Sequence, residues 1–207
     1  MSMTKASGKS SQFMKKHSFN GQLAQQLGIT DAIVLKYMAA RTRSSTNVRG
    51  GKNWFYMTGD DLAMKFPYIS KSGVEKAIKR LRAEKCIEIA NFNKLPFDMT
   101  RWFHVPQEYQ DASEEKPIVF DVDVAVAHGV PAAVLLHNYR YHTEKNGSEH
   151  RMSPAALNQY LPFLSKPTIK RALKKLRAAN LIPQIRTGAS KAELDAESDD
   201  KAQNETG

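Results

Sequence analysis

The stretch FPYISKSGVEKAIKRLRAEKCI, residues 66–87, occurs a second time in the chain as LPFLSKPTIKRALKKLRAANLI, residues 161–182. Nine of the 22 aligned positions are identical, at a constant offset of 95 residues. In each copy a turn containing a proline leads to a serine, Ser70 or Ser165, of the type preferred at a helix N-cap. The chain therefore contains the same turn and the same helix start twice.

The residues after each serine have the spacing of an amphipathic helix. Apolar side chains recur at intervals of three, four and seven residues and form one stripe, while basic residues occupy the opposite side. The apolar stripe consists of Val74, Ala77, Ile78 and Leu81 in the first copy, and of Ile169, Ala172, Leu173 and Leu176 in the second. We expect each stripe to pack inward and each basic side to face solvent.

A second internal match precedes the first one. Residues 19–35 align with residues 120–136 at an offset of 101, and the six-residue difference between the two offsets falls in a loop, where length changes are tolerated. A tandem duplication explains both matches. In both segments a good N-cap residue starts a short helix and a glycine in the left-handed conformation is expected to end it. The caps are Asn20 and Asp121, and the glycines are Gly28 and Gly129.

The order of elements in one copy predicts the fold. A helix over about residues 31–43 is followed by a short strand at 54–57, a helix capped by Thr58, the turn, and the third helix. Aromatic and β-branched residues on both sides of an Asn/Pro/Asp loop then predict a hairpin over residues 87–105. This is the order of a winged helix-turn-helix, so the expected fold is mainly α with small β-hairpins, an α+β tandem winged helix-turn-helix.

Five segments are expected along the chain. The second copy lacks most of the hairpin, or wing, and the prolines and acidic residues between the copies are typical of a linker. The segments are a basic arm at 1–18, a first winged helix at 19–105, a linker at 106–119, a second winged helix with a reduced wing at 120–186, and a disordered acidic tail at 187–207.

The charge of the chain points to a polyanionic partner. The formal net charge is +10, and the tail from Thr187 onward holds two lysines and six acids, so the remaining residues carry +14. Such a basic body suits nucleic acid or an anionic membrane surface. No apolar run approaches the about 18 residues needed to span a bilayer. The single cysteine, Cys86, excludes an internal disulfide and a multi-cysteine zinc site, so a cytoplasmic protein is the expectation.

The basic sides of the two third helices are the candidate DNA-contacting surfaces, because this helix enters the major groove in such motifs. Lysines there would contact phosphates, whereas Ser, Thr and Arg near the helix start could reach base edges. The wing would add two cations. The candidates are Lys71, Ser72, Lys76, Lys79, Arg80, Lys94, Arg101, Lys166, Thr168, Lys170, Arg171, Lys174 and Lys175. A solvated helix surface is the alternative interpretation of the same lysines and arginines.

Catalytic and cofactor sites are not indicated. The carboxylate pairs Asp60-Asp61 and Asp121/Asp123 stand at helix starts, where acids favour the helix dipole. His137 and His142 have no carboxylate at ligand spacing. Cys86 aligns with a leucine of the second copy, as a core residue would. We therefore expect no enzyme activity, no cofactor and no metal.

Residues 19–105 also resemble the winged-helix domains of phage and plasmid replication-type proteins. The resemblance rests on the FP-x-x-S turn at 66–70 and on the N-K-x-x-F-D-x-T-x-W hairpin at 93–102. It implies sequence-specific binding of double-stranded DNA and a role as transcription regulator or replication initiator of a mobile element. A homodimer and a host or replication protein are further partners that this role would allow.

Two other functions remain open from the sequence. Tandem winged helices also serve as protein–protein modules in chromosome-organising complexes, and the lost second wing favours that alternative. A binder of RNA or single strands would need exposed aromatic residues beside the basic surface. The aromatic residues at 54–55 and 102–103 are instead expected in the core beneath the wing.

Overall fold

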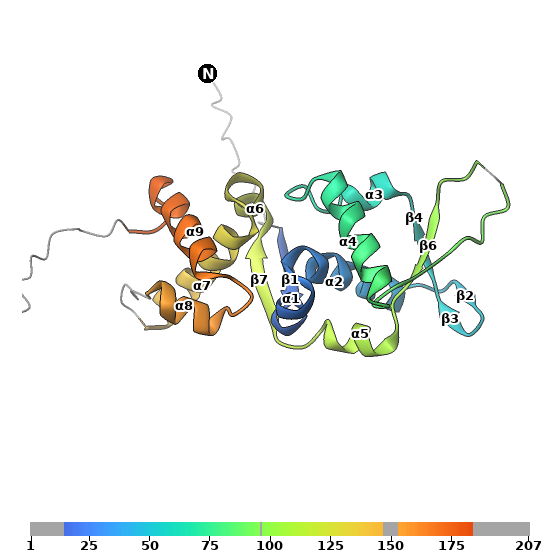
Figure 1. Ribbon diagram of the computed structural model, residues 1–207, viewed down its shortest axis with the longest axis horizontal. Helices are drawn as coiled ribbons and strands as arrows, with labels where there is room; N and C mark the ends of the chain where they lie inside the picture. The colour runs from blue at the N-terminus through green and yellow to red at the C-terminus, as the bar shows by residue number, and fades with distance from the viewer. Residues whose placement is uncertain (1–14, 96, 147–152, 184–207) are drawn as a thin grey trace, which may run out of the picture.

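The computed structural model describes residues 15–95, 97–146 and 153–183, and within them the chain is mainly helical with small antiparallel sheets, as the sequence predicts (Figure 1). Most of the expected arm and the whole expected tail lie outside the described residues. The first repeat contains β1 (Lys16–Asn20), α1 (Gly21–Leu27), α2 (Ile29–Arg43), β2 (Val48–Arg49), β3 (Lys52–Asn53), β4 (Phe55–Met57), α3 (Gly59–Ala63), α4 (Lys71–Ala83), β5 (Glu88–Ala90) and β6 (Arg101–His104).

The described part of the second repeat follows the same order, with no counterpart of β2 to β6. Its elements, with the helix that precedes them, are α5 (Gln107–Ala112), β7 (Pro117–Asp121), α6 (Val122–His128), α7 (Val130–Asn146), α8 (Pro154–Tyr160) and α9 (Lys166–Ala178). In the first repeat β4, β6 and β5 form a three-stranded antiparallel sheet with β6 in the centre. Within the described part of the second repeat, no strand follows α9.

The two repeats are joined by an antiparallel pair of equivalent strands, β1 and β7. Ser18 pairs with Val119, its own counterpart at the offset of 101. On the two sides of this pair the equivalent residues meet in reversed roles: Phe19 pairs with Ile118, the counterpart of His17, and His17 pairs with Phe120, the counterpart of Phe19. Such a pairing is unchanged by a rotation of 180°, as in the symmetric contact of a twofold dimer. A local twofold axis therefore relates the strands of the two repeats.

One hydrophobic core extends through both repeats. The stripes of α4 and α9 are buried as predicted, and they belong to the same cluster as Phe19 and Phe120. These two equivalent rings lie 6.1 Å apart across the β1–β7 pair. Phe163, in the turn before α9, packs edge-on against Phe19 at 5.4 Å. Buried apolar area is the main stabilising contribution, so the two repeats stabilise each other.

The segment expected to be a linker differs from that prediction, because it contains α5 and most of β7. Gln110 is buried and its side-chain amide donates to the Val105 carbonyl. Glu114, one of the acidic residues in this segment, accepts from Lys36 and Arg43 of α2. The connection is therefore packed against the first repeat.

The caps of the short helices are only partly as expected. The Asn20 side chain accepts from the Leu23 amide, so this N-cap is confirmed. Asp121 was predicted to cap the equivalent helix, but its side chain makes no capping bond. Its Oδ2 atom lies 3.7 Å from Nη1 of Arg140 instead. Gly28 and Gly129 have positive φ angles of 94° and 90°, which require glycine. Their ψ angles of 154° and 155° lie outside the predicted left-handed helical region.

Candidate nucleic-acid interface

The helices α4 and α9 are held in the same way. Ser70 accepts from the Gly73 amide, and Ser165 accepts from the Thr168 amide, so both predicted N-caps are confirmed. Each helix buries its apolar stripe and exposes its lysines. In Figure 1 both helices lie on the side toward the viewer and run in opposite directions, as the local twofold axis requires. One surface of the molecule therefore presents both basic helices.

Three of the predicted contact cations in the first repeat form ion pairs with carboxylates. Arg80 donates through Nε and Nη2 to Asp31, whose carboxylate is 3% exposed, and the bond raises the pKa of Arg80. Arg101 of β6 donates through both Nη atoms to Glu75 of α4, at 3.0 and 2.6 Å. Lys71 forms an ion pair with Asp60 of α3. Arg80 and Arg101 were predicted to contact DNA, but the structure brings both guanidinium groups into intramolecular pairs.

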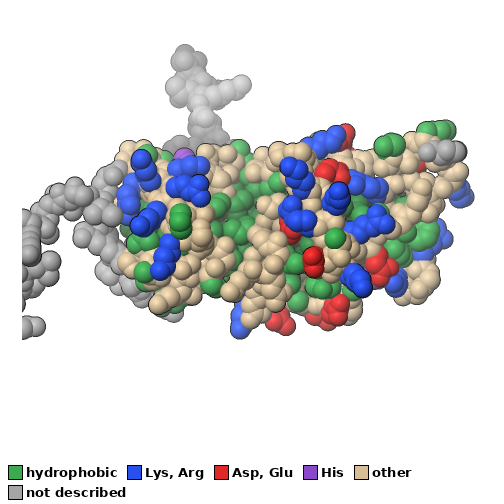
Figure 2. Space-filling model, in the orientation of Figure 1, with side chains coloured by type: hydrophobic (Ala, Val, Ile, Leu, Met, Phe, Trp, Pro, Cys, Tyr) green, Lys and Arg blue, Asp and Glu red, His purple; other side chains and the backbone are tan. Residues whose placement is uncertain are grey.

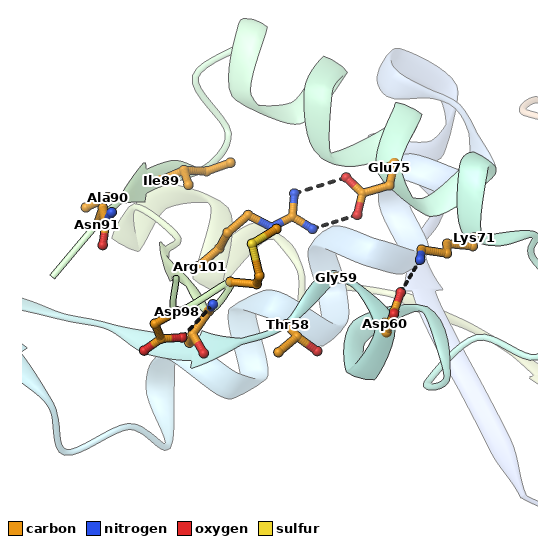
Figure 3. A pocket seen from close by; sticks show the side chains of 12 residues that line it. Thr58, Gly59, Asp60, Lys71, Glu75, Ile89, Ala90, Asn91, Asp98 and Arg101 are labelled. Carbon is orange, nitrogen blue, oxygen red and sulfur yellow. Dashed lines mark hydrogen bonds and ion pairs between the residues drawn. The ribbon is translucent and has the colours of Figure 1, made fainter. Parts of the chain in front are cut away.

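A cleft of about 730 Å³ lies between the start of α4 and the wing strands β5 and β6 (Figure 3). The Arg101–Glu75 pair crosses it, with Lys71 and Asp60 at one end and Asp98 on the other side. Gly59 allows this arrangement, because a Cβ atom there would lie 2.5 Å from Arg101 Nη2 and 2.6 Å from Glu75 Oε1. Of the predicted contact residues, Lys71 of α4 and Arg101 of the wing thus line one groove, which carries both signs of charge.

The wing loop is internally braced and presents apolar side chains to solvent. The Asn93 amide donates to the carbonyls of Asp98 and Thr100, and its oxygen accepts from the Trp102 indole. Phe97 and Met99 on the same loop are 76% and 81% exposed. No local sequence pattern predicted their exposure. Of the strand aromatics, Trp54, Phe55 and Phe103 are buried as expected, while Trp102 is only half-buried.

The basic surface of α9 has a different character. Lys166, Lys170, Arg171 and Lys174 are exposed, and α9 carries no acidic residue. Lys175 donates to the His128 carbonyl at 3.3 Å, and the Thr168 hydroxyl is 2.8 Å from that of Ser165, so both predicted contact residues have local partners. Figure 2 shows lysines and arginines without acids over α9, but lysines and arginines interleaved with acids over α4 and the wing.

The remaining titratable groups among the described residues are assigned to no further site. Burial lowers the pKa of His137 and raises the pKa of the Cys86 thiol, which is buried in the core. Among the described residues, no group of three or more histidine, cysteine or acidic side chains is placed to hold a metal ion. None of the helices in the described ranges is long and apolar enough to cross a membrane.

Comparison of the chain with known protein families, curated proteins and solved structures found no match. The resemblance of residues 19–105 to replication-type winged helices therefore stays a prediction from the residues themselves.

Proposed function

We propose that this protein is a non-enzymatic binder of double-stranded DNA, composed of two winged helix-turn-helix repeats whose third helices, α4 and α9, face one duplex. The observation that carries the proposal is that two basic, N-capped helices related by a local twofold axis lie on the same surface. Helices related in this way in dimeric regulators enter major-groove segments about 34 Å apart. The net charge of +10 favours association with the phosphate backbone.

The biological role follows from the resemblance alone. Replication-type winged helices of mobile elements act as transcription regulators or replication initiators, and we assign this protein to that class of role. Such a protein works where its DNA is, in the cytoplasm at the nucleoid, with a homodimer or a replication protein as a further partner.

The test is binding of the purified protein to random-sequence duplex DNA by fluorescence anisotropy over a salt series. The logarithm of the binding constant should fall linearly with the logarithm of salt concentration, with a slope of several units, because each neutralised phosphate contributes about −0.9. Footprinting on a selected duplex should then show two protected segments. Absence of binding at low salt would refute the proposal, and one short protected segment would refute the two-helix arrangement.

A protein-docking module is the second candidate, and the exposed Phe97 and Met99 of the wing loop favour it. Apolar side chains held at the surface by a braced loop are typical of a protein interface. Charge reversal at Lys71 and Lys166 separates the two functions. A DNA-binding protein should lose affinity for duplex DNA, whereas a docking module should keep its activity and have no DNA phenotype.

A further inference from the structure

The two repeats differ in the acids that pair with cations around the third helix, because three such acids of the first repeat are absent from the second. The offsets pair Asp31 with Ala132, Asp60 with Ala155, and Glu75 with Lys170. In the first repeat these three acids hold Arg80, Lys71 and Arg101 respectively. The second repeat therefore has the same arrangement of cations on its third helix without the carboxylates that neutralise them.

From this comparison we infer that the two helices have different tasks on DNA: α9 anchors the phosphate backbone irrespective of sequence, and the α4–wing groove reads the bases. The inference rests on the proposed function and assigns a task to each half of that surface. The element recognised by α9 is a run of phosphates, and the element recognised by the α4–wing groove is the base edges.

The anchoring task follows from the free charge on α9. Lys170, Arg171 and Lys174 are exposed and, within the described ranges, none of them forms an ion pair. Phosphate contacts by such cations release counterions and make binding salt-dependent without carrying sequence information. The first turn of α9 also offers less for base recognition, because Pro167 replaces the hydroxyl-bearing Ser72.

The reading task follows from the mixed charge of the groove. Asp60, Glu75 and Asp98 line the cleft beside α4, where they oppose the close approach of phosphates. Carboxylates can accept from the amino group of cytosine. The ion pairs with Lys71 and Arg101 also hold the Asp60 and Glu75 side chains in fixed positions, as selective recognition requires. A surface of this kind gains little from random DNA and more from one particular sequence.

The repeat supplies a matched pair of variants for the test. Glu75 of α4, which lines the groove, and Lys170 of α9 occupy equivalent positions. We compare E75Q with K170Q in the full chain, using anisotropy over a salt series on a random duplex and on a duplex selected by the wild-type protein. Circular dichroism confirms that both variants are folded.

K170Q should lower the salt slope by about 0.9, the contribution of one contact, and should weaken binding to both duplexes by the same factor. E75Q should not lower the slope on the random duplex, and it should reduce the ratio of affinities for selected over random DNA. Equal effects of the two variants on both duplexes, or the reverse assignment, would overturn the division of tasks. Failure of the wild-type protein to bind either duplex would instead refute the proposed function itself.

Discussion

Removing the Arg80 side chain should destabilise the protein much more than a change on an exposed helix surface usually does. Asp31, in the first turn of α2, is almost completely buried, and Arg80 satisfies both of its carboxylate oxygens. The R80A variant leaves that carboxylate buried without its cation. Breaking a buried ion pair in this way costs about 3–5 kcal/mol. Since the Arg80 side chain is 53% exposed, water can partly replace it, and we expect a loss of about 2–3 kcal/mol.

The second repeat provides the compensating variant. At the equivalent positions it has Ala132 and Lys175 in place of Asp31 and Arg80. The double variant D31A/R80K should therefore be within about 1 kcal/mol of wild type, because no charge is then left buried without a partner. The single variant D31A loses the ion pair and a favourable acid at a helix start, which makes it the matched control.

The assay is urea unfolding followed by circular dichroism, with thermal unfolding as a second measurement. At this chain length a loss of 2–3 kcal/mol corresponds to a fall in melting temperature of about 5–10 °C. The reasoning is refuted if R80A costs less than about 0.5 kcal/mol. It is equally refuted if D31A/R80K is as unstable as R80A, because the Asp31–Arg80 coupling would then be absent.

Two further predictions concern pH and the shared core. The His17 ring is bonded to the Tyr68 hydroxyl at 2.6 Å, and burial, with Lys15 nearby, holds its pKa below the ordinary value of 6.5. Protonation of this ring is then easier in the unfolded chain, so the free energy of unfolding should decline as the pH falls below about 6.5. The H17I variant introduces the residue found at the equivalent position, Ile118. Urea titrations at several pH values should show a smaller decline for H17I than for wild type. L81A should lower the stability by about 2–5 kcal/mol while keeping one cooperative thermal transition, since both repeats share one core. Two separate transitions in calorimetry would contradict that core.

Local patterns predicted the third helix of each repeat and its start. The N-caps Ser70 and Ser165 and the buried stripes of α4 and α9 follow from side chains that lie within a few residues of each other. Capping bonds and helix periodicity act over one or two turns, so a sequence contains all the information that they need. The internal repeat strengthened these predictions, because each pattern was present twice.

Contacts between distant segments could not be predicted in the same way. The β1–β7 pairing joins residues about a hundred positions apart, and nothing in the short strand at 16–20 specifies its partner. The Asp31–Arg80 pair spans 49 positions, so Arg80 was grouped with the free cations of its helix. The wing pair of Arg101 with Glu75 was missed for the same reason. These pairs change the charge that the candidate interface presents, and only the tertiary structure contains them.

The duplicated architecture explains how two helices on one surface can differ in charge. In a homodimer both third helices have the same sequence, so a carboxylate that improves base reading on one of them also repels phosphates on the other. Within one chain the buried positions keep their character, as in Leu81 and Leu176, while an exposed position can change from Glu75 to Lys170. Packing restricts which residues a buried position can hold and leaves an exposed position free to vary. The local twofold axis is therefore a property of the core and of the β1–β7 pair, and the surface that would meet DNA is free to be asymmetric.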